Sequence, residues 1–181
     1  MKKTRNKSMA FTAILIAFGI LIPMMMPAKI VIPPASYTLA SHVTIFMALF
    51  ISLPVAILVA FGTTLGFLLT GMPFLIVLRA LSHLLFVLIG GLILQKFPKL
   101  IDKPLTLSLF AVMINLIHGI AEFALVYLLT VTTTTEAGYI WTILGLVGLG
   151  TVVHGLIDFY LAYYLFRFLS NKVGIDFSLK K

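Results

Sequence analysis

Residues 74–95 read FLIVLRALSHLLFVLIGGLILQ, an apolar run that holds a single charged residue, Arg79. A helix needs roughly 20 such residues to cross the hydrocarbon core of a bilayer. A charged side chain inside that core is costly and is a candidate functional residue by default. The segment therefore predicts a transmembrane helix with a functional polar group, and similar apolar runs lie on both sides of it.

The composition of the whole chain is that of a membrane protein. Of its 181 residues, 61% are hydrophobic and only 10% are charged, so long stretches must be solvated by lipid. At roughly 20 residues per span, there is room for about six helices and for no separate catalytic or nucleotide-binding domain. The sequence has no P-loop motif and no cysteine, which excludes ATP hydrolysis by that route, disulfides and thiolate metal sites.

Proline and glycine breaks divide the apolar sequence into six predicted spans. Pro23 and Pro27 end the first span, Pro54 opens the third, and residues 71–73 close it. The spans cover about residues 9–27, 38–52, 54–70, 74–95, 105–129 and 140–169. The second and third are short enough to be partly re-entrant. We expect an all-α integral membrane protein with six transmembrane helices, in a single membrane domain at residues 1–181.

Basic residues are confined almost entirely to one side of the predicted membrane, as is typical of cytoplasmic segments. Eleven of the thirteen lie in the N-terminal tail, in the link between the fourth and fifth spans, or at the C-terminal end: Lys2, Lys3, Arg5, Lys7, Lys96, Lys99, Lys103, Arg167, Lys172, Lys180 and Lys181. Six spans place both termini, including the basic tail at 1–8, in the cytoplasm. Anchoring to an anionic leaflet explains the net charge of +8, so we expect no nucleic-acid partner.

Three predicted spans carry polar residues three or four apart, which places them on one helical face. The stripes are Arg79 with Ser82 and His83, Asn115 with His118 and Glu122, and His154 with Asp158. Because polar groups are costly in lipid, the stripes are expected to face one another or a watery cavity. The predicted topology opens this cluster mainly outward, which suits a protein that captures a solute from outside. Arg79 could contact an anionic ligand or neutralise Glu122.

The same residues allow other roles. The pairs His118–Glu122 and His154–Asp158 could be purely structural. A metal site built from His83, His118, His154 and Glu122 is conceivable by ligand type. Nothing resembles the H-E-x-x-H spacing of zinc enzymes, and no nucleophile–base pair is present. We therefore expect no bound metal and no catalytic residue.

The first external loop is too apolar for a simple solvated connector. Residues 30–42 read IVIPPASYTLASH, and Pro33-Pro34 stiffens the segment. A semi-rigid apolar loop above an outward-opening cavity is expected to act as a gate or lid, which we place at residues 28–38.

Small residues recur four apart in two predicted spans. The pairs are Ala13 with Ala17 in the first span, and Ala56 with Ala60 and Gly62 with Gly66 in the third. Such faces let helices approach closely in lipid. Internal packing is the simplest role for any one pair, whereas an outward-facing Ala13–Ala17 seam would dock a partner membrane protein.

A small, six-span, basic-inside protein with Ala13-x-x-x-Ala17 and a long loop after its first span resembles the substrate-binding S components of energy-coupling factor (ECF) vitamin transporters. The resemblance covers essentially the whole chain, and segments 33–41, 62–66 and 78–83 look most like members assigned to small vitamins. It implies a multi-pass protein of the bacterial plasma membrane that binds a water-soluble vitamin near its outer face. It also implies a transmembrane T component, contacted by Ala13 and Ala17, with two ABC ATPase subunits that use the ATP. The chain itself is expected to need no cofactor.

The resemblance further implies which residues contact the substrate: Tyr37, His42, Arg79, His83, Asn115, His118, Glu122 and His154. A single Trp gives little surface for stacking a flavin or pterin, whereas Arg, His and Asn suit a compact hydrogen-bonding ligand. A pyridine or pyrimidine compound (pyridoxine, hydroxymethylpyrimidine or niacin) is the first expectation. Pantothenate is the second, because Arg79 could pair with its carboxylate. A self-sufficient proton-coupled carrier, with the His–Glu and His–Asp pairs as a relay, stays open.

Overall fold

The computed structural model describes residues 2–133 and 135–172, and Lys180 and Lys181 lie outside the described residues. Its helices are α1 (Lys2–Met25), α2 (Val43–Ile51), α3 (Leu53–Leu69), α4 (Phe74–Lys96), α5 (Pro104–Thr130), α6 (Tyr139–Ile143) and α7 (Gly150–Lys172). A 3-10 turn, η1 (Pro98–Ile101), joins α4 to α5, and a π-helical segment, η2 (Leu144–Leu149), joins α6 to α7. The only strands in this part of the chain are β1 (Lys29–Ile32) and β2 (Ala35–Thr38). The predicted helical membrane architecture is confirmed.

Four described helical segments are long and apolar enough to cross a membrane: Asn6–Met25, Phe74–Lys96, Pro104–Thr130 and Tyr139–Lys172. At 17 residues α3 is shorter. The predicted span at 38–52 is wrong in extent, because Thr38 belongs to a strand and α2 has only nine residues. Nine residues rise about 14 Å, too little to cross the hydrocarbon core. Six full spans, and the side of the membrane that each terminus faces, remain predictions.

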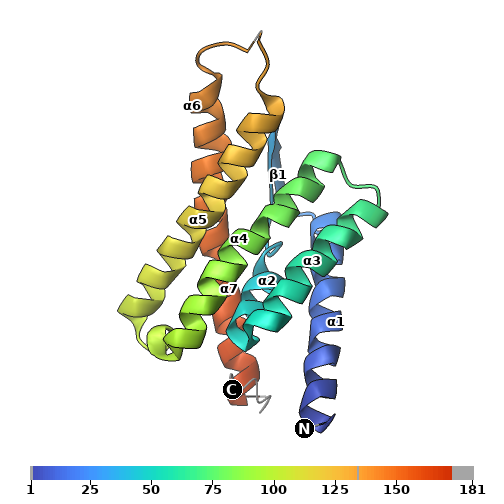
Figure 1. Cartoon of the computed structure of the whole chain (residues 1–181), viewed down its shortest axis with the longest axis vertical. Helices are drawn as coiled ribbons and strands as arrows, with labels where there is room; N and C mark the ends of the chain where they lie inside the picture. Colours follow the sequence, from blue (N-terminus) through green and yellow to red (C-terminus); the bar gives the residue numbers. More distant parts are fainter. Residues whose placement is uncertain (1, 134, 173–181) are drawn as a thin grey trace.

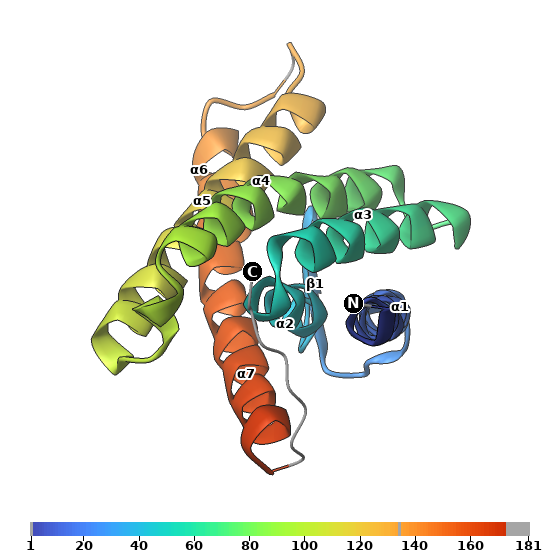
Figure 2. The ribbon, with the colours of Figure 1, turned by 60° about the horizontal axis from the view of Figure 1, so that its bottom comes forward.

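The helices form a bundle in which the basic segments gather at one end. Figure 1 shows the start of α1, the turn between α4 and α5, and the end of α7 together at the bottom of the molecule. In sequence order α3, α4, α5 and α7 each pack against the next, while α1 packs against α3 and α2. Figure 2 shows α1 at one side of the bundle and α2 between α3 and α7. The basic segments thus lie at one end of the bundle, as expected if they all face the same side of the membrane.

The short helix α2 forms the centre of the core. Every residue from Val43 to Phe50 is buried, because the helix touches α1, α3, α4 and α7. Its Phe46 ring lies 5.3 Å from the ring of Phe159 and 5.4 Å from that of Phe86. Ser52 lies between α2 and α3 in an extended conformation, and its hydroxyl caps the start of α3 by accepting a hydrogen bond from the backbone N–H of Val55.

The small-residue pairs divide into internal and exposed faces. Ala56 and Ala60 are buried, and Gly62 and Gly66 lie against Ile16 and Ile20 of α1. A Cβ atom at position 62 would come within 2.6 Å of the Ile16 Cδ1 atom, so this glycine lets α1 and α3 approach closely. Both pairs in α3 therefore serve internal packing. By contrast, Ala13 and Ala17 are exposed on the far side of α1.

The predicted lid at 28–38 contains an antiparallel hairpin, which the sequence did not predict. Lys29 pairs with Thr38 and Ile32 with Ala35, and the Pro33-Pro34 peptide bond at the tip is cis. The hairpin has one exposed strand, β1, and one partly buried strand, β2. The chain then turns through Ala40, whose φ of 67° is unusual for a residue with a side chain, and enters α2.

Candidate binding site

A buried ion pair joins α4 to α5. The Arg79 guanidinium donates to the Glu122 Oε2 atom through Nε at 3.1 Å and through Nη2 at 2.7 Å. Both side chains are almost fully buried, so the pair supplies the compensation that charges inside a bundle require. Among the described residues, Nη1 of Arg79 makes no hydrogen bond. The geometry therefore shows Arg79 as the counter-charge of Glu122, with one donor group left over.

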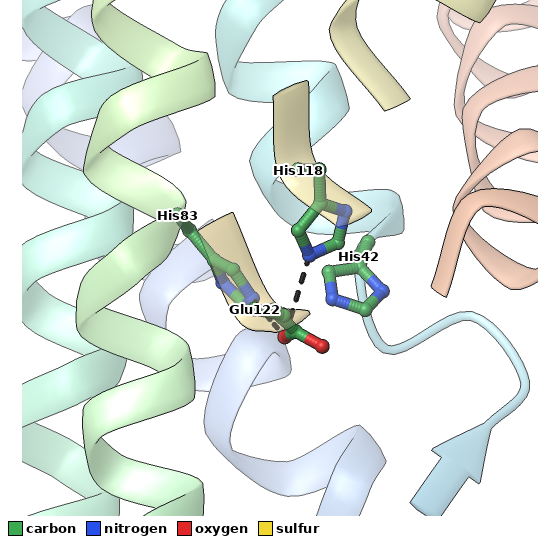
Figure 3. Close-up of side chains that lie close together, drawn as sticks. All are labelled: His42, His83, His118 and Glu122. Carbon is green, nitrogen blue, oxygen red and sulfur yellow. Dashed lines mark hydrogen bonds and ion pairs between the residues drawn. The ribbon is translucent and has the colours of Figure 1, made fainter. Parts of the chain in front are cut away.

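The two oxygens of Glu122 have different surroundings. Oε2 accepts both Arg79 bonds and a 2.8 Å bond from the Thr151 hydroxyl. Oε1 lies 3.3 Å from Nε2 of His83 and 3.4 Å from Nε2 of His118. Figure 3 shows these two imidazoles and that of His42 gathered around the carboxylate. The polar stripes of α4 and α5 thus meet, as their spacing predicts.

A second polar group ties the turn before α2 to α7. Asp158 accepts 2.8 Å hydrogen bonds from the backbone N–H groups of Ala40 and His42. Its Oδ2 atom also lies 3.2 Å from Nδ1 of His42. His154 approaches the same place, with Nε2 3.0 Å from the Ser41 hydroxyl and 3.2 Å from Nδ1 of His42. His42 therefore stands between the two polar groups.

A cavity of about 80 Å³ lies beside these residues. Polar side chains line it on several sides: Ser36, Thr38, Ser41, His42, Thr44, Thr63, Arg79, His83 and Glu122. Its apolar wall consists of Pro23, Ile45, Phe67, Ile76 and Ala80. Because Pro23 and Phe67 are near the ends of α1 and α3, and Ile76 is near the start of α4, the cavity lies at the end of the bundle opposite the basic segments.

The residues expected to contact a substrate are all at or near this cavity, but only some line it. His42, Arg79, His83 and Glu122 do. His118 lies one layer behind them, fully buried, and His154 lies behind His42.

Two of the expected contacts are set further back. Asn115 is buried, donates from Nδ2 to the carbonyl of Ala111, and has Oδ1 next to Gly155. The Tyr37 hydroxyl abuts Gly150 without a hydrogen-bond partner among the described residues, and burial raises the pKa of this phenol. Both therefore support the wall of the site from outside the cavity.

Several polar contributors were not among the expected site residues. Thr151 holds Glu122 and Asp158 holds the turn before α2. Ser41 contacts His154 and Asp158. A signal for Thr151 exists in the sequence, because it precedes His154 by three residues and so shares its helical face. The hydroxyls that α2 and α3 contribute, Thr44 and Thr63, carry no such pattern, since neither helix holds a charged residue or a histidine.

A small cavity with convergent polar groups, inside an apolar helical bundle, defines a membrane protein that binds a compact polar solute. The chain is 39% identical over 177 residues to the niacin transporter NiaX of Lactococcus lactis subsp. cremoris (strain MG1363). The aligned region covers 97% of this chain and 80% of the relative. The chain therefore belongs to the family of this transporter, a multi-pass vitamin-uptake protein of the cell membrane, and the resemblance to ECF S components is confirmed. No family model and no solved structure matches the chain.

Proposed function

We propose that this chain is the substrate-binding S component of an ECF-type transporter and that its ligand is niacin in its acid form, nicotinate. The observation that carries the proposal is the cavity itself, in which Arg79 and two imidazoles face an apolar wall. A flat aromatic ring with one carboxylate matches a cavity with a polar side and an apolar side, because the ring can lie on the apolar wall while the carboxylate accepts hydrogen bonds from the donors. The identity to a niacin transporter supports the same ligand.

The size of the cavity favours a ligand with a single ring. About 80 Å³ is small for a ligand site, and the wall residues are aliphatic apart from Phe67, so a flavin or pterin finds neither room nor stacking partners. Pyridoxine and hydroxymethylpyrimidine fit by size but have no carboxylate for the remaining Arg79 donor. Pantothenate has the carboxylate but lacks the flat ring.

The hairpin of β1 and β2 supports a role as lid. Ser36 and Thr38 of β2, with Ser41 and His42 after it, line the cavity. The turn between β2 and α2 is attached to α7 through Asp158. Movement of the hairpin away from α7 would expose the cavity toward the end of the bundle that the charge rule places outside.

The exposed face of α1 supports a membrane partner. Ala13 and Ala17 are exposed together with Ile14 and Phe18. Among the described helices, α1 packs mainly against α3 and α2. Two small residues four apart on such a face allow a second helix to approach closely. We assign this face to the T component, with two ABC ATPases supplying the energy.

Calorimetry of the purified chain against nicotinate, nicotinamide, pyridoxine, hydroxymethylpyrimidine and pantothenate tests the ligand. Nicotinate is expected to bind most tightly, with nicotinamide about 10- to 100-fold weaker, because a charge-assisted hydrogen bond contributes about 1.5–3 kcal/mol. Tighter binding of another member of the panel would assign the site to that compound. Uptake of nicotinate into liposomes by the chain alone, without ATPase subunits, would instead support a self-sufficient carrier.

A further inference from the structure

Three histidines and one glutamate from three different segments converge beside the cavity. The rings of His42, His83 and His118 form a triangle whose centroids are 4.8, 4.8 and 4.9 Å apart, and each pair of rings meets edge to face. One ligand atom from each ring and one oxygen of Glu122 all lie within 4.8 Å of one another. Figure 3 shows the four side chains pointing toward a common centre. We call this set the histidine–glutamate cluster.

The spacing inside the histidine–glutamate cluster matches that of ligands around a metal. Nitrogen and oxygen ligands lie about 2.0–2.1 Å from a tetrahedral Zn²⁺, so two such ligands are about 3.3 Å apart. The Glu122 Oε1 atom is 3.3 Å from Nε2 of His83 and 3.4 Å from Nε2 of His118. The distances from Glu122 to these two histidines are therefore those of a tetrahedral site, and the remaining ligand distances, all within 4.8 Å, would have to shorten around an ion.

The ring nitrogens of His118 are poorly satisfied by the residues around them. Its side chain is 0% exposed, Nδ1 has no hydrogen-bond partner among the described residues, and Nε2 has only the long 3.4 Å contact with Glu122 Oε1. A buried polar atom without a partner costs about 1–3 kcal/mol, and such atoms are rare in folded proteins. An ion at the centre of the cluster would take the Nε2 lone pair and reduce that cost.

The neighbouring hydrogen bonds orient two of the four groups as ligands. In the tautomer with its proton on Nδ1, His42 donates to Asp158 at 3.2 Å and keeps the lone pair on Nε2 for an ion. Metal-binding histidines usually donate their second ring N–H to a carboxylate in this way. Glu122 is held similarly, because Arg79 and Thr151 occupy Oε2 and leave Oε1 for an ion.

The charge of the site also favours a cation. With neutral imidazoles, the buried charges are one positive group, Arg79, and two negative groups, Glu122 and Asp158. This excess of one negative charge weakens the binding of a carboxylate ligand, which Arg79 alone must offset. A divalent ion reverses the sign, so that a bound carboxylate would bring the site to neutrality.

From these observations we infer that the histidine–glutamate cluster binds a divalent transition-metal ion of the Zn²⁺, Co²⁺ or Ni²⁺ class, next to the ligand cavity. Three imidazoles and one carboxylate are the donor set that such ions prefer over Mg²⁺ or Ca²⁺. The inference of a metal site depends only on the geometry of these residues. Its effect on the affinity for an anionic vitamin rests in addition on the proposed function.

The test uses the whole chain, purified in detergent without a polyhistidine tag, stripped with a chelator and titrated with Zn²⁺ alone. Calorimetry and elemental analysis should show about one Zn²⁺ per chain. Replacing Zn²⁺ with Co²⁺ should give the visible absorption of a tetrahedral site. The absence of stoichiometric uptake of either ion would overturn the inference, whatever the result with nicotinate.

Single substitutions then assign the ion to the cluster. His83→Gln and His118→Gln are expected to weaken Zn²⁺ binding at least tenfold. The control is Asp102→Asn, an exposed carboxylate between α4 and α5 that is not part of the cluster, which should leave Zn²⁺ affinity within about twofold. Equal loss in the control, or no loss in His83→Gln, would overturn the assignment. His83 is only partly buried, so its variant remains informative if His118→Gln fails to fold.

A second titration separates the metal site from the proposed function. Nicotinate is expected to bind the Zn²⁺-loaded chain at least tenfold more tightly than the stripped chain. Equal affinity for both forms would overturn the link between the ion and the anion and leave the proposed ligand standing. Zn²⁺ binding without any nicotinate binding would support the metal site and overturn the ligand.

Discussion

Nη2 of Arg79 lies 2.7 Å from Oε2 of Glu122. Arg79 is the only charged residue within the apolar part of α4, and Glu122 is the only one within that of α5. The contact joins two helices that face each other along much of their length. It also fixes the carboxylate around which the three histidines gather. The stability of the bundle and the shape of the site therefore depend on the same pair.

Removal of one member of the pair should destabilise the protein strongly. Arg79→Met leaves the buried Glu122 carboxylate without its main partner, at a cost of about 3–5 kcal/mol. The double variant Arg79→Met/Glu122→Gln should lose less than the sum of the two single variants, because it leaves no unpaired charge. Melting curves in detergent measure both effects, with the exposed Asp102→Asn as control. Additive losses would show that the two side chains are energetically independent.

Replacement of Asp158 should loosen the turn before α2. Asp158→Ala leaves the backbone N–H groups of Ala40 and His42 without acceptors, at a cost of about 1–3 kcal/mol for each buried group. It also removes the contact that holds Ala40 at its positive φ. Hydrogen exchange of residues 40–42 is expected to speed up, whereas Asp102→Ala should change nothing there. Unaltered exchange in the Asp158 variant would mean that other contacts hold the turn.

Enlargement of Gly62 should disturb the seam between α1 and α3. A leucine side chain at this position overlaps Ile16, because even a Cβ atom would come within 2.6 Å of it. Overpacking of this kind costs about 1–3 kcal/mol. Gly145→Leu is the matched control, since a Cβ there meets nothing within 4 Å. Equal melting temperatures for the two variants would contradict the close packing of this seam.

Bulky residues on the exposed face of α1 should block the membrane partner and spare the ligand. Ala13→Trp and Ala17→Trp are expected to reduce co-purification of the T component and ATPases at least tenfold, with nicotinate affinity unchanged. Leu109→Trp, on an exposed position of α5, controls for a general effect of a surface tryptophan. Full recovery of the complex with both alanine variants would place the docking surface elsewhere.

The sequence predicts much of the fold because membrane helices are encoded by long apolar runs with clear breaks. The spans around Arg79, Asn115 and His154 appear within a few residues of their predicted bounds. The hairpin and the start of α2 could not be predicted in the same way. They depend on Asp158, which lies more than a hundred residues away in the chain and accepts hydrogen bonds from the backbone of Ala40 and His42.

In the site, too, the contacts within one helix can be predicted from the sequence, whereas the contacts between distant segments cannot. Helical spacing correctly groups His118 with Glu122 and His154 with Asp158, and the structure brings each pair together. Spacing does not reveal that His42 makes the third side of the imidazole triangle, because its position depends on the turn before α2. A metal set drawn from residue types alone therefore chooses His154 in place of His42.

If the hairpin acts as the proposed lid, the position of His42 makes occupancy of the site and closure of the hairpin parts of one thermodynamic cycle. Its Nδ1 atom and backbone N–H hold the turn to α7, while the ring faces the cavity and the other imidazoles. Any ligand or ion that binds better to His42 in this position must stabilise the closed hairpin by the same free energy. A loaded protein would then differ from an empty one in the rate at which its hairpin opens, and a partner could distinguish the two without touching the vitamin.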